Sequence, residues 1–95
     1  MTEYRITYWQ EIPAMVAARD GSATGKAALP DRFQEAIDEA AMQQGLAGSE
    51  AYLEQWRHGE WIEGEGAPDE VVTAVAARLD ADYPPQRLDE LVVAR

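Results

Sequence analysis

The chain has 95 residues, which is enough for one domain with a single hydrophobic core. Its net charge of −10 at pH 7 repels phosphate backbones and anionic lipid head groups, which excludes nucleic acids and membrane surfaces as expected partners. The sequence has no cysteine, which rules out disulfides, thiolate metal ligands and thiol catalysis.

The N-terminal sequence MTEYRITYWQ has neither the basic start nor the apolar core of a signal peptide. No apolar run approaches the roughly 18 residues that a membrane span requires. We therefore expect a cytoplasmic protein.

Two stretches near the N-terminus have the pattern of strands. Residues 3–9 alternate aromatic or β-branched residues with polar ones, and residues 13–19 alternate again after Pro13. We expect them to pair as an antiparallel hairpin. After the turn-rich residues 20–25, a short third strand at residues 26–29 is an option.

The alternation also predicts which aromatic side chains of the first strand are buried. Tyr4, Ile6 and Tyr8 share one face, and Trp9 points to the other. Because helices that cover one face would bury the first set, we assign Tyr4, Ile6 and Tyr8 to the core. Trp9 is then expected at the surface.

The rest of the sequence predicts three helices. Residues 31–45 repeat apolar positions at helical spacing, Ser49 is a good N-cap for a helix at 49–58, and Pro68 begins a helix at 68–82. Between the last two, residues 60–63 have the composition of a short strand.

These elements predict an α+β fold with two layers, in which about three helices cover one face of a small, mainly antiparallel sheet led by the N-terminal β-hairpin. We expect residues 1–83 to form a single domain. Residues 84–95 are a C-terminal tail whose leucine and valine spacing would allow a docked helix.

The sequence offers no recognisable catalytic or metal site. GSATGK at residues 21–26 departs from the Walker pattern in its spacing and in the alanine after its lysine. His58 is the only histidine, and its expected place at a helix C-terminus needs no substrate. The acids between Glu60 and Glu70 match no calcium loop and are expected to be solvated. We therefore expect no metal and no cofactor, and the sequence gives no positive support for enzymatic activity.

Four separated phrases resemble a family of small bacterial proteins described as virulence factors. They are YWQEIPAMVAARDG, LPDRFQEAIDEAAM, GSEAYLEQWRHGEW and the helix that begins at Pro68. Related domains occur in proteins of the conserved virulence factor C type. The resemblance implies an α+β domain without an established reaction, so it transfers no functional residue. Its association with corrinoid-dependent methyl-transfer genes suggests an alternative, an accessory enzyme or ligand carrier in one-carbon metabolism.

The favoured hypothesis is a non-catalytic binding protein with a protein partner, engaged through exposed aromatic residues and through strand addition at the hairpin edge. A homodimer in which the tail docks on a neighbouring chain is a further alternative. The residues expected to contact the partner are Trp9, Gln10, Arg19, Tyr52, Trp56 and Trp61.

Overall fold

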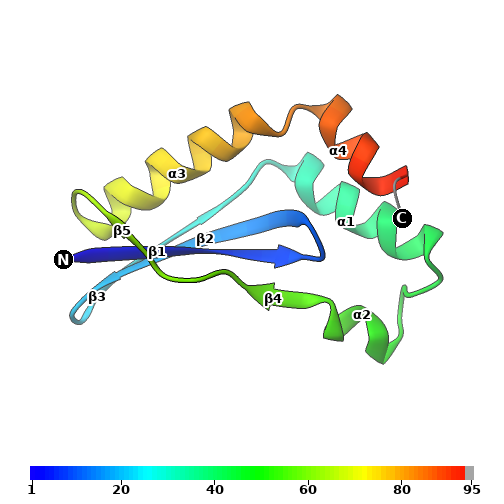
Figure 1. Cartoon of the computed structure of the whole chain (residues 1–95), viewed down its shortest axis with the longest axis horizontal. Coiled ribbons are helices and arrows are strands. Elements are labelled where there is room, and N and C mark those ends of the chain that lie inside the picture. The colour runs from blue at the N-terminus through cyan, green and yellow to red at the C-terminus, as the bar shows by residue number, and fades with distance from the viewer. Residues whose placement is uncertain (94–95) are drawn as a thin grey trace.

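The computed structural model describes residues 1–93 and confirms an α+β fold built on an N-terminal hairpin (Figure 1). The strands are β1 (Thr2–Trp9), β2 (Ile12–Asp20), β3 (Ala23–Ala28), β4 (Trp56–His58) and β5 (Ile62–Gly64). The helices are α1 (Asp31–Gln43), α2 (Glu50–Glu54), α3 (Pro68–Asp82) and α4 (Pro85–Val93).

The strands form one antiparallel sheet with β1 near its centre. The order is β3-β2-β1-β4, and β5 also pairs with β1. On the side of β1 away from β2, β4 pairs with its C-terminal half and β5 with its N-terminal half. Because β3 also pairs with β2, neither strand of the hairpin has a free edge. The expectation of strand addition at the hairpin edge is therefore wrong.

One face of this sheet carries the helices. α3 packs across β3, β2 and β1, and α1 packs on β2 and against α4. Tyr4 and Ile6 lie in the resulting core as expected, while Tyr8 is partly buried at its border. At Gly25 of β3, an added Cβ would lie 3.0 Å from the backbone of Pro68, so β3 and the first turn of α3 are in close contact.

Trp9 is buried, with 0% of its surface exposed, so its expected position at the surface is wrong. The alternation argument considered helices over one face only. The segment after α1 instead places α2 and β4 against the indole: Trp9 pairs with Trp56, and its Nε1–H donates to the Tyr52 carbonyl at 2.9 Å. Figure 1 shows this segment passing around the turn end of the hairpin.

The helix predicted at 49–58 is shorter than expected. Ser49 caps it by accepting a hydrogen bond from the Tyr52 amide, but α2 ends at Glu54. The next residues pair with β1 as β4, and this pairing satisfies their backbone groups in place of further helical turns. His58 consequently lies in a strand, where its Nδ1 is hydrogen-bonded to the Thr7 hydroxyl at 3.0 Å.

The predicted tail forms α4 and packs on α1 of the same chain. Leu88 and Val92 belong to the hydrophobic core. Residues 94 and 95 of the tail lie outside the described residues. The N-terminus and the end of α4 lie at opposite ends of the molecule (Figure 1).

Candidate functional site

The sheet face opposite α3 carries a cationic and aromatic cluster at the end of the sheet away from α2. Residues that alternate with the core positions of β1, β2 and β3 point to this open face. We define the open-face cluster by five of the side chains that gather there: Glu3, Arg5, Arg19, Lys26 and Trp61.

Trp61 is held against two guanidinium groups. Arg19 Cζ lies 3.8 Å and Arg5 Cζ 4.6 Å from the centre of its ring. The indole comes from the connection between β4 and β5, and β1 and β2 supply the arginines. Ala17, a residue with a small side chain, lies opposite Arg5 across the strands. Cation–π contacts of this kind hold an aromatic side chain in place at a surface.

The two arginines differ in their polar partners. Nε of Arg19 donates to Glu3 Oε1 at 3.4 Å and Nη2 to the same oxygen at 3.3 Å. The Arg5 side chain has no hydrogen bond or ion pair among residues 1–93, and its Nε is shielded from solvent. Lys26, which lies across from Ala17 on β3, likewise has no carboxylate within ion-pair distance in the described structure.

The charge of this face differs from that of the chain as a whole. It carries three cationic side chains of the cluster, and strand pairing places two carboxylates there, Glu3 and, across from it on β5, Glu63. The whole chain has 18 acidic residues against 8 basic ones. Cations therefore outnumber acids within the open-face cluster, although four other arginines of the described residues lie elsewhere: Arg32, Arg57, Arg78 and Arg87.

The structure divides the six predicted contact residues into two groups. Arg19 and Trp61 meet in the open-face cluster. An aromatic group at the turn end consists of Trp9, Tyr52 and Trp56. The ring centres of Trp9 and Tyr52 are 5.5 Å apart, and those of Tyr52 and Trp56 are 6.2 Å apart. Gln10 also lies at that end, so the six do not form one surface.

Gln10 has a structural role at the turn. It adopts a left-handed backbone conformation (φ 55°), which a tight hairpin turn requires. Its side-chain amide donates to Gln44 at 2.8 Å and to Gln55 at 3.2 Å, and Gln44 donates back at 3.0 Å. These bonds tie the turn to the ends of α1 and α2.

Sequence reasoning missed Glu3, Arg5 and Lys26 as members of the site. The alternation of β1 already placed Glu3 and Arg5 on the face opposite Tyr4 and Ile6, which is a usable signal. The position of Lys26 beside them depends on the pairing of β3 with β2, which the sequence pattern did not specify.

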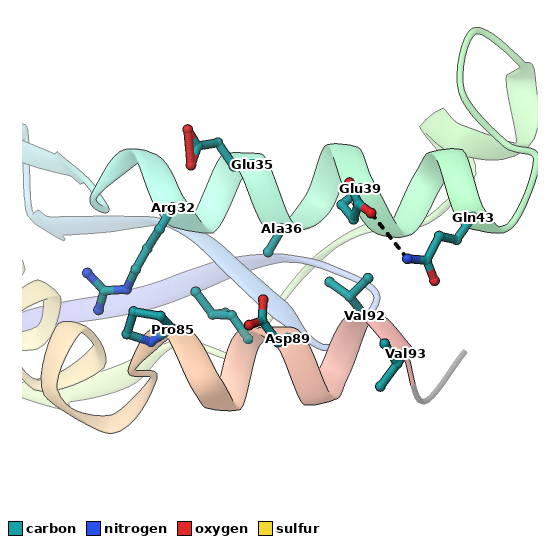
Figure 2. Close-up of a pocket in the computed structure, with 10 residues that line it drawn as sticks. Arg32, Glu35, Ala36, Glu39, Gln43, Pro85, Asp89, Val92 and Val93 are labelled. Atoms are coloured by element: carbon teal, nitrogen blue, oxygen red, sulfur yellow. Dashed lines mark hydrogen bonds between the residues drawn. The ribbon is translucent and has the colours of Figure 1, made fainter.

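A groove of about 410 Å³ lies between α1 and α4. Figure 2 shows Ala36, Asp89 and Val92 directed into the gap between the helices, with Glu35 directed away from it. The Gln43 side-chain amide donates to Glu39 at 3.2 Å. No nucleophile and base meet here, so the groove has the character of a helix–helix seam.

Two smaller hollows lie near the turn end. One hollow, of about 370 Å³, is lined by polar residues that include Gln10 and Arg57. The other, of about 240 Å³, is lined mainly by apolar residues that include Met42 and Tyr52. Trp61 lines none of these three hollows, and neither does Trp56. A ligand carrier built on these two tryptophans therefore gains no support from them.

Two pKa shifts lie on the helix-covered side of the sheet. Burial raises the pKa of Tyr8, and the neighbouring Tyr83 adds to the effect. The hydrogen bond that Arg78 donates to the Tyr4 hydroxyl, at 3.1 Å, raises the pKa of Arg78. Both shifts favour the form already present at pH 7, so neither prepares a group for proton transfer.

Metal-binding and membrane-spanning features are absent from the described residues. Within residues 1–93, no three histidine, aspartate or glutamate side chains converge as metal ligands would. None of the helices in the same range combines the length and the apolar character needed to cross a bilayer.

Comparison with known proteins indicates the family of the chain. A family model described as "Virulence factor" matches residues 7–92, which runs from the middle of β1 to the penultimate residue of α4. Neither curated proteins nor solved structures give a significant match.

Proposed function

The chain belongs to the virulence factor family, and we propose that it acts as a non-catalytic binding protein that engages a protein partner through the open face of its sheet. The observation that carries the proposal is the contact of Trp61 with both Arg5 and Arg19 on the sheet face opposite α3.

Residue chemistry supports a binding role for this cluster. Tryptophan and arginine are enriched among the residues that contribute most to binding at protein interfaces. Trp61 is partly exposed and is restrained by two contacts, so little side-chain entropy is lost when a partner covers it. The strands beneath provide a rigid support, which loops would not.

A comparison of two variants tests the proposal. The protein is isolated under native conditions from cells that express wild type, Trp61→Ser or Leu53→Ser, and bound proteins are identified. Leu53 is an exposed apolar residue on α2, outside the cluster, so its replacement is the matched control.

We expect Trp61→Ser to lose a partner that wild type and Leu53→Ser retain. Circular dichroism must show that both variants remain folded. A partner that Trp61→Ser retains at wild-type level would contradict the proposed binding face.

A further inference from the structure

We infer that the open-face cluster binds carboxylate side chains of an acidic segment of the partner protein, and that Glu3 occupies part of this site in the free protein. The inference rests on the proposed binding function and specifies the chemistry of the partner.

The first support is the unused donor capacity of Arg5. A guanidinium group carries five N–H donors, yet Arg5 has no acceptor among residues 1–93, and its Nε has no access to solvent. A shielded donor without a partner is energetically unfavourable. In a chain with 18 acidic residues, this cation lies where none of the described carboxylates reaches it.

The second support is the way in which Trp61 holds the arginines. A guanidinium group that stacks on an aromatic ring keeps its N–H edge free for a carboxylate in the same plane. With Arg19 Cζ 3.8 Å from the ring centre, the indole would orient this edge and contact the aliphatic part of an incoming Glu or Asp side chain. The cluster therefore combines donors for the acid group with an apolar surface for its stem.

The third support is the weakness of the internal ion pair. Glu3 uses one oxygen for both contacts with Arg19, at 3.3 and 3.4 Å, instead of the paired geometry of a strong bond. The side chains are 43% and 48% exposed, and exposed pairs of this kind contribute little to stability. A partner carboxylate can therefore displace Glu3 from Arg19 at low cost.

Charge favours a short acidic segment over a nucleic acid. The cluster supplies three cations within a chain of net charge −10, which repels a long polyanion at distances up to about 10 Å at 0.1 M salt. A short segment with a few carboxylates is attracted by direct contact with Arg5, Arg19 and Lys26. Because it is short, it is repelled less by the net negative charge of the rest of the chain.

Binding of an acetylated hexaglutamate peptide to the full chain, measured by isothermal titration calorimetry, tests the inference. Glu3→Gln removes the internal competitor and is paired with Glu90→Gln, which removes the same charge from the exposed side of α4. Arg19→Gln and Arg5→Gln each remove a guanidinium donor of the cluster. Their control is Arg87→Gln, which removes the same charge near the start of α4. Hexaglutamine is the uncharged control peptide.

We expect Glu3→Gln to bind hexaglutamate about two- to fivefold more tightly than Glu90→Gln does. Arg19→Gln and Arg5→Gln should bind at least about threefold more weakly than Arg87→Gln. If Arg5→Gln does not fold, Arg19→Gln gives the same test.

Three results would overturn the inference: equal affinities of Glu3→Gln and Glu90→Gln, equal binding of hexaglutamine, or binding of a single-stranded oligonucleotide in preference to hexaglutamate. If any of these occurs while Trp61→Ser still loses the native partner, the acidic-segment inference fails and the proposed binding face stands. If Trp61→Ser retains that partner, the binding face itself fails.

Discussion

Trp9 and Trp61 have opposite environments although both belong to the same small sheet. Trp9 is fully enclosed, and its indole N–H has a carbonyl partner, so it contributes to the core. Trp61 lies on the open face and contacts arginine side chains. The difference predicts different consequences for stability.

Replacement of Trp9 by alanine should lower the free energy of unfolding by about 3–5 kcal/mol, because it leaves a cavity and an unpaired Tyr52 carbonyl. Trp61→Ala should lower it by less than about 1 kcal/mol, since it removes surface contacts only. Urea denaturation followed by circular dichroism measures both. Equal losses would show that Trp61 is a core residue.

Tyr8 should ionise above its ordinary pKa of 10.0, because burial disfavours the phenolate. The folded state then holds the phenolic proton more tightly than the unfolded state does. This contribution to stability is fully present below about pH 10 and is lost as the pH rises through the raised pKa. The ultraviolet absorbance titration of wild type minus that of Tyr8→Phe isolates this ionisation, and a midpoint at or below 10.0 would disprove the shift.

Among the elements, α4 shows how a short helix is held by its neighbour. Leu88 is 2% exposed and packs in the core, whereas Val93 on the same helix is 72% exposed. A helix of 9 residues is not stable alone in water, so its contact with α1 must hold it.

Leu88→Ala should therefore cost about 2–5 kcal/mol of unfolding free energy, while Val93→Ala changes it by less than about 0.5 kcal/mol. Thermal or urea denaturation of the two variants gives the comparison. An unaffected Leu88→Ala variant would show that α4 does not dock on its own chain in solution.

The packing of β3 against α3 depends on a residue without a side chain. At Gly25 an added Cβ would lie 2.9 Å from Asp69 Oδ1 and 3.0–3.1 Å from the backbone of Pro68 and Asp69. Gly25→Ala should destabilise the fold by about 1–3 kcal/mol, because the first turn of α3 must move. Thr24→Ala, at an exposed neighbouring position, is the control for denaturation, and a loss no larger than that of the control would refute this contact.

The elements also show where sequence patterns succeed. Residues 68–82 form α3 with the predicted limits, because Pro68 at its start, an apolar repeat and the two prolines after it all agree. The helix predicted at 49–58 fails after Glu54, where pairing with β1 overrides a pattern read over few residues. Local propensity could not reveal this pairing, since it joins segments about 50 residues apart.

For the molecule as a whole, the sheet separates the face packed against α3 from the face that carries the open-face cluster. The α+β class and the antiparallel hairpin could be predicted from periodicity. Arg19 and Trp61 were also identified as candidates, but their contact required the chain to return along β1 as β4 and β5. Sequence alone therefore named two members of the open-face cluster without indicating that they meet.

Site-specific photo-crosslinking in cells gives the sharpest test of the binding face. A photoreactive amino acid is placed at Ala17, on the open face opposite Arg5, or at Ala74, on the exposed side of α3. The proposed binding face predicts a discrete protein adduct from position 17 and none from position 74. An adduct from position 74 with none from position 17 would contradict the account, because the partner would then bind the helical layer.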